Sequence, residues 1–160
     1  MQGLDDLYRE VILDHYRTPH GSAPIDDVSV EVDGFNPLCG DELKLALKIA
    51  NGRVESVHIE PSGCSLSVAS ASMLAQQLPG MSIDDAIALK ETFKSVMRGE
   101  SWPDGLDPGD LEALEGVKSF PVRIKCVLLA WMALEQALAE YDPALGGQVE
   151  ADKDIEVRAS

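Results

Sequence analysis

The chain is organised around one alternating stretch, Glu42-Leu43-Lys44-Leu45-Ala46-Leu47-Lys48-Ile49, followed by Ala50-Asn51-Gly52. Its apolar residues fall on every second position, which is the period of a strand with one buried and one wet face. Asn51-Gly52 favours a type I′ turn, so the chain should return as an antiparallel partner strand through Val57 and Ile59. Upstream, Val28, Val30 and Val32 alternate in the same way and predict a further strand.

Helices are expected on both sides of these strands. Apolar spacing, a capping-box signal at Ser82 and a proline at position 121 predict helices over about 4–17, 65–78, 82–97 and 121–141, with a short one near 111–115. The order of elements predicts an α+β domain, in which helices cover a short three-stranded antiparallel sheet. We expect a single domain over residues 1–141 and an acidic, flexible C-terminal tail over 142–160.

Composition excludes several classes of function. The 160 residues carry a formal net charge of −15, which argues against binding nucleic acid or an anionic membrane surface. Six carboxylates and no Lys or Arg lie within residues 99–116. The sequence has neither a signal-peptide pattern nor a membrane-spanning apolar run, so a cytoplasmic location is expected. The chain has only three cysteines, and this low, odd number argues against a disulfide framework.

The three cysteines lie in different local settings. Cys39 belongs to the run Asn36-Pro37-Leu38-Cys39-Gly40-Asp41, Cys64 follows Gly63 at the start of a predicted helix, and Cys126 lies inside the last helix. Three sulfurs and the Asp41 carboxylate supply four ligands, the number that a tetrahedral zinc site needs, and they equally suit an iron–sulfur cluster. The alternative interpretation is that the cysteines are small buried hydrophobic residues.

Such a site would be anionic, because three thiolates and one carboxylate outweigh the charge of a divalent cation. Arg123 and Lys125, beside Cys126 in the sequence, are the cations that could support it. Gly40 would have to form a tight turn for Cys39 and Asp41 to reach the same ion.

These motifs, taken in order, resemble a known family. The matching segments are 7–17 with Pro19 and Gly21, the run Asn36–Asp41, Gly63-Cys64-Ser65 with its Ser/Ala-rich helix, and Arg123-Ile124-Lys125-Cys126. Together they resemble the U-type iron–sulfur cluster assembly proteins, the IscU and NifU N-terminal-like family, and most closely its zinc-dependent SufU branch. Two differences from the scaffold branch are Lys125, where scaffolds have histidine, and an acidic insertion near 97–116 between the second and third cysteines.

The resemblance implies a SufE/IscU-like fold and a zinc ion held by Cys39, Asp41, Cys64 and Cys126. It also implies a zinc-dependent sulfurtransferase of the SUF system, whose partner is the PLP-dependent cysteine desulfurase SufS, alongside other SUF components. In this family the residue matching Cys39 accepts the persulfide sulfur after a desulfurase histidine displaces it from zinc. Arg123 would then support the charge of the site.

Two other functions remain open from the sequence. The same ligands could assemble a [2Fe–2S] cluster on a non-enzymatic scaffold, with iron in place of zinc. A Cys–His hydrolase would need a histidine near a thiol, and His15, His20 and His58 all lie far from the cysteines in sequence.

Overall fold

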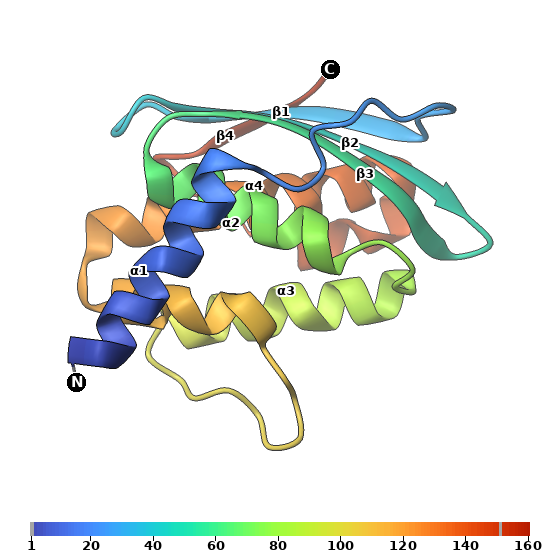
Figure 1. The fold of residues 1–160 in the computed structure, drawn as a ribbon. Helices are drawn as coiled ribbons and strands as arrows, with labels where there is room; N and C mark the ends of the chain where they lie inside the picture. The colour runs from blue at the N-terminus through green and yellow to red at the C-terminus, as the bar shows by residue number, and fades with distance from the viewer. Residues whose placement is uncertain (1, 151) are drawn as a thin grey trace.

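The computed structural model describes residues 2–150 and 152–160 (Figure 1). Its α-helices are α1 (Gln2–Arg17), α2 (Ser65–Gln77), α3 (Ile83–Met97) and α4 (Pro121–Tyr141), and its 3-10 helices are η1 (Gly109–Ser119) and η2 (Pro143–Gln148). The strands are β1 (Val30–Asn36), β2 (Asp41–Ala50), β3 (Arg53–Ser62) and β4 (Glu156–Ala159). The predicted α+β class is confirmed, and the predicted helices all form. No helix within 2–150 or 152–160 is long and apolar enough to cross a membrane.

The sheet is antiparallel with strand order β3-β2-β1-β4. The predicted hairpin between β2 and β3 is present, and Asn51 and Gly52 both take the positive φ values of a type I′ turn. The alternating residues Leu43, Leu45 and Leu47 point into the core, whereas Glu42 on the other face is exposed. The pleat therefore produces the one-sided burial that the alternation predicts.

Helices α2 and α4 cover the buried face of the sheet, and α1 packs across α2 (Figure 1). Helix α2 is lined with small buried residues, which allow close packing between the sheet and α4. Trp131 on α4 is fully buried and stacks on Phe93 of α3, with ring centroids 4.7 Å apart. This core fixes the start of α2 and the first turns of α4, where Cys64 and Cys126 lie.

The structure corrects two expectations about the C-terminal residues. Within the described residues the sheet has four strands rather than three, because β4 pairs with β1, and the described parts of the C-terminal segment, 142–150 and 152–160, are not simply a flexible tail. Ile155 is buried at 6% exposure, and Lys125 forms ion pairs with Asp152 and Asp154. Backbone pairing with β1, one apolar anchor and these ion pairs therefore hold the segment on the domain.

A buried ionic network also fastens this segment. Lys90 and Lys94 of α3 and Glu135 of α4 are almost completely buried and meet through the Glu135 carboxylate. The Gln148 side chain accepts a hydrogen bond from Lys90 at 2.7 Å, and Glu150 lies 3.4 Å from the Lys94 ammonium. The C-terminal segment thus supplies polar partners that two buried lysines need.

The acidic insertion is only partly a solvent-exposed loop. Residues 98–108 extend away from the body (Figure 1). Helix η1 then packs Leu111, Leu114 and Val117 into the core. Asp110 at its start accepts a hydrogen bond from Nε2 of the buried His15 at 2.7 Å. The η1 part of the insertion therefore packs against α1, close to the cysteines.

Candidate metal centre

The loop that carries Cys39 is a tight connection between β1 and β2. Asn36 and Asp41 are directly opposed as the last pair of the ladder, and the Cys39 N–H donates to the Asn36 carbonyl at 3.3 Å. Gly40 has a φ of +71°, a conformation that glycine adopts without strain. This is the turn that the sequence required for Cys39 and Asp41 to face the same point.

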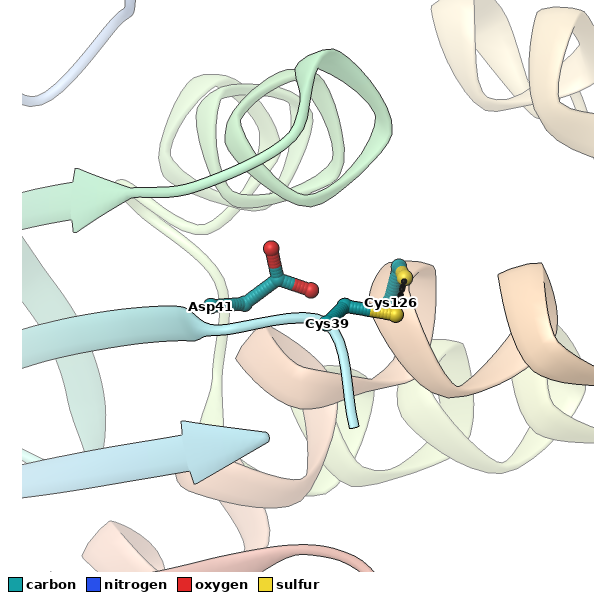
Figure 2. A group of neighbouring side chains, drawn as sticks. All are labelled: Cys39, Asp41 and Cys126. Atoms are coloured by element: carbon teal, nitrogen blue, oxygen red, sulfur yellow. Dashed lines mark hydrogen bonds between the residues drawn. The ribbon is translucent and has the colours of Figure 1, made fainter. Parts of the chain in front are cut away.

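Cys39, Asp41 and Cys126 meet at one place. One ligand atom from each lies within 4.8 Å of the others, and the sulfurs of Cys39 and Cys126 are 3.1 Å apart (Figure 2). A disulfide bond is about 2.0 Å long, so the two cysteines are free thiols in contact. Residues separated by most of the chain therefore form a compact group of soft and anionic ligands.

Cys64 lies at the edge of this group. It is the N-cap of α2, and its sulfur accepts a hydrogen bond from the Ser67 N–H at 3.5 Å. That contact turns the sulfur back toward its own helix, 4.0 Å from an Asp41 carboxylate oxygen. The structure thus brings three of the four expected ligands together and leaves the fourth beside the carboxylate.

Asp41 connects the group formed with Cys39 and Cys126 to Cys64 at the start of α2. Its side chain is 1% exposed, and Oδ1 accepts a hydrogen bond from the Cys64 N–H at 3.0 Å. Gly63 makes this contact possible: a Cβ atom there would lie 2.2 Å from Asp41 Oδ1 and 2.9 Å from Asp41 Cα. Gly63 also has a φ of +138°, a backbone conformation that residues with a Cβ atom rarely adopt.

The electrostatics of the group suit a bound cation. Cys126 is 3% exposed, and burial raises the pKa of its thiol above the usual range. The hydrogen bond with Cys39 and the nearby Cys64 and Asp41 raise this pKa further. Three thiols and a carboxylate form a donor set that fits zinc, and thiols also suit iron–sulfur clusters.

The three cysteines line one open cavity of about 700 Å³ between α1, η1 and the start of α4. Arg123 lines the same cavity, is exposed, and its guanidinium carbon lies 4.9 Å from the centroid of the Phe120 ring. Among the described residues no carboxylate pairs with Arg123, so its charge faces the cavity without a competing ion pair. Lys125, the other expected cation, instead pairs with Asp152 and Asp154.

The histidines lie away from the cysteines, and none of the described residues lining this cavity is a histidine. His15 is hydrogen-bonded to Ser72 and Asp110, and His58 contacts the Ala23 carbonyl. The geometry therefore offers no support for a Cys–His hydrolase.

Sequence reasoning missed Asn36. It is fully buried, and its side-chain Nδ2 donates to Asp41 Oδ2 at 3.4 Å and to Cys126 Sγ at 3.9 Å. Its place in the same short run as Cys39 and Asp41, immediately before a proline, is the only sequence signal that could have pointed to it.

Comparison with known proteins gives consistent matches over most of the chain. Residues 7–145 match the family described as the NifU-like N-terminal domain. The zinc-dependent sulfurtransferase SufU of Bacillus subtilis is 45% identical over 139 residues, covering 87% of this chain and 94% of that protein. The iron–sulfur cluster assembly scaffold protein IscU of Streptococcus pyogenes is 38% identical over 135 residues, covering 84% of each chain.

A solved structure has the same fold. The iron–sulfur cluster assembly scaffold protein for the SUF system from Fervidobacterium islandicum superposes with a TM-score of 0.75 at 29% identity, covering 81% of this chain and 94% of that one. The resemblance expected from the four sequence motifs is therefore confirmed, and so is the IscU-like architecture.

Proposed function

Because this chain belongs to the NifU-like N-terminal domain family, we propose that it is a zinc-dependent sulfurtransferase. It accepts persulfide sulfur from a PLP-dependent cysteine desulfurase and relays that sulfur for iron–sulfur cluster assembly. This proposal depends most on one observation: ligand atoms of Cys39, Asp41 and Cys126 converge within 4.8 Å, and the two cysteines line an open cavity. The Bacillus subtilis relative, which carries the same activity in its name, supports it.

Cys39, Asp41, Cys64 and Cys126 are the residues that would hold the zinc ion. When bound, zinc keeps such thiols deprotonated near neutral pH, which is the form that reacts with sulfur electrophiles. The Cys64 sulfur, 4.0 Å from Asp41, would have to leave the Ser67 N–H to join the group. Arg123, in the same cavity, would offset part of the negative charge.

Cys39 is the sulfur acceptor in this proposal. The Cys64 sulfur accepts an N–H from Ser67, and the Cys126 sulfur accepts one from Asn36. Within the described residues, the Cys39 sulfur has a thiol as its only hydrogen-bonding neighbour. It also lies on a turn, whereas Cys126 is anchored in α4, so Cys39 can move at least cost.

The transfer itself balances without an external oxidant. The Cys39 thiolate attacks the outer sulfur of the donor persulfide, and a new sulfur–sulfur bond forms on Cys39. The sulfur–sulfur bond of the donor breaks at the same time, and its electron pair leaves with the donor cysteine, which takes up a proton. The product is a persulfide on Cys39 and a regenerated donor thiol.

The surface around the cavity supports a protein donor. Leu38, Phe120 and Val122 are 59%, 51% and 58% exposed, and two of them line the cavity that holds the cysteines. Exposed apolar side chains gathered at a reactive site are typical of an interaction surface. A desulfurase that seats on this rim would bring its persulfide to Cys39 and exclude water from the reaction.

The test is to incubate the zinc-loaded protein with a cysteine desulfurase and free cysteine, then measure the intact mass and the modified peptide. We expect one added sulfur on Cys39, no uptake by Cys39→Ala, and loss of uptake when zinc is chelated. Asp41→Ala should mainly weaken zinc retention. Uptake by Cys39→Ala equal to that of the wild type would refute the assignment.

A scaffold that assembles a [2Fe–2S] cluster is the second candidate, because relatives such as the Streptococcus pyogenes protein are named scaffolds. Lys125 favours the first candidate. It occupies the position where scaffolds have histidine, and its ammonium pairs with Asp152 and Asp154. A colourless purified protein with about one zinc per chain supports the transferase, and a brown protein supports the scaffold.

A further inference from the structure

We propose that Asn36 is a positioning residue that holds Cys126 and Asp41 on the metal and thereby leaves Cys39 as the ligand that is released. This inference rests on the metal site of the proposed function. Asn36 is the last residue of β1, is 0% exposed, and lies directly opposite Asp41 in the ladder.

Asn36 contacts three of the four proposed ligand residues. Its Nδ2 group donates to Asp41 Oδ2 at 3.4 Å and to Cys126 Sγ at 3.9 Å, and its main-chain carbonyl accepts from the Cys39 N–H at 3.3 Å. The contacts differ in kind. Asp41 and Cys126 are held through their ligand atoms, whereas Cys39 is held only through its backbone.

The orientation of the Asn36 amide fits an anionic site. Its Oδ1 atom is buried and has no hydrogen-bond partner among the described residues. The opposite orientation would place this oxygen against a carboxylate and a thiolate, both acceptors when a metal is bound. An unpaired, buried Oδ1 atom is unfavourable. The two hydrogen bonds that Nδ2 donates to the ligands offset this cost and favour an amide side chain at this position.

The consequence is a difference between the sulfurs. The Asn36 Nδ2 group donates to the sulfur of Cys126 and stabilises it as a thiolate, which strengthens its hold on a cation. The Cys39 sulfur has no such donor within the described residues and should be the first to exchange. Removing the Asn36 amide should therefore weaken zinc binding and also abolish the order in which the cysteines react.

The experiment uses Asn36→Leu, which nearly preserves volume and removes the N–H donors. Zinc affinity is measured by chelator competition. Thiol reactivity is measured by limited iodoacetamide treatment of the zinc-loaded protein followed by peptide mapping. We expect the zinc dissociation constant to rise at least about tenfold, the scale seen for loss of contacts that orient metal ligands. In the wild type Cys39 is alkylated first, and in the variant Cys126 is alkylated at a comparable rate.

Ser72→Ala is the matched control. Ser72 is also fully buried, and its hydrogen bonds are to His15 and the His20 N–H rather than to any of the proposed ligands. It should lose stability but keep both the zinc affinity and the order of alkylation. If Asn36→Leu behaves like this control, with affinity within about twofold of the wild type and Cys39 still modified first, the proposal is overturned.

If Asn36→Leu does not fold, the proposal is tested on the wild-type protein by NMR. With ¹⁵N-labelled protein, the Asn36 carboxamide signals should shift when zinc is added, and unchanged signals would overturn the proposal. Neither readout needs a desulfurase. Zinc binding without sulfur uptake would therefore refute the proposed transferase and leave the role of Asn36 standing, whereas a wild type that binds no zinc would refute both.

Discussion

Gly63→Ala should damage the metal centre without changing any ligand. Gly63 has a φ of +138°, and an added Cβ would lie 2.2 Å from Asp41 Oδ1 and 2.9 Å from Asp41 Cα. Because one of these atoms is backbone, rotation of a flexible side chain cannot relieve the contact. The turn before α2 or the start of β2 must therefore move.

The magnitude follows from two contributions. Forcing an alanine into this backbone region costs about 1–3 kcal/mol. Displacing the Asp41 carboxylate also breaks its hydrogen bond from the Cys64 N–H, and bonds to charged groups contribute about 1.5–3 kcal/mol. We expect a loss of about 2.5–6 kcal/mol in the free energy of unfolding of the metal-free protein, together with strongly reduced zinc affinity.

Urea unfolding and chelator competition measure these two quantities. Gly52→Ala is the matched control, because Gly52 also has a positive φ, +73°, but among the described residues, its two chain neighbours aside, no atom lies within 4 Å of a Cβ built there. It should lose only about 1–2 kcal/mol and bind zinc normally. A Gly63→Ala protein that is no less stable than this control and binds zinc equally well would show that the close approach of Gly63 to Asp41 is not needed for the site.

Three further predictions concern the C-terminal segment and its buried network. Ile155→Ala should lower the free energy of unfolding by about 2–4 kcal/mol in urea titrations, because Ile155 is buried at 6% exposure; no measurable loss would mean that the segment is detached in solution. Glu135→Leu should cost about 3–5 kcal/mol, since it removes the carboxylate shared by two buried lysines, and an unchanged thermal midpoint would contradict this. Burial works to raise the pKa of Glu150, but the hydrogen bond from Arg98 and the charge of Lys94 hold it below its ordinary value. The contribution of Glu150 to the free energy of unfolding is therefore present above about pH 4.3 and lost as pH falls through the lowered pKa. Glu150→Gln and the wild type should converge in stability on acidification, and a difference that stays constant would argue against the pairing of Glu150 with Arg98 and Lys94.

The parts of the fold that follow from local patterns could be predicted. The alternation of Leu43 to Ile49 with Asn51-Gly52 specifies a hairpin, and burial of one face confirms it. The side chain of Ser82 accepts from the Asp85 N–H at the start of α3, as the capping signal predicted.

The C-terminal strand was not predicted, because β4 is only four residues long, and the alternation of Val157 and Ala159 with Glu156 and Arg158 is too short a pattern to specify a strand. It is held by the free edge of β1 and by ion pairs to Lys125, which are tertiary contacts between distant parts of the chain. Local sequence patterns carry no information about such contacts.

The candidate site divides in the same way. The motif around Cys39 and Asp41 identified two ligand residues, and the required turn at Gly40 is present. The orientation of the Cys64 sulfur toward Ser67 and the contacts of Asn36 depend on how the start of α2 meets the end of β1. Spacing along the chain does not determine how these two elements pack, so neither the Cys64 orientation nor the contacts of Asn36 could be predicted from the sequence alone.

Zinc K-edge X-ray absorption on the purified, zinc-loaded protein measures the ligand set of the metal. We expect three sulfur neighbours at about 2.3 Å and one oxygen neighbour at about 2.0 Å, falling to two sulfurs in Cys39→Ala. A wild-type spectrum with one sulfur or none, or one that Cys39→Ala leaves unchanged, would contradict this ligand set.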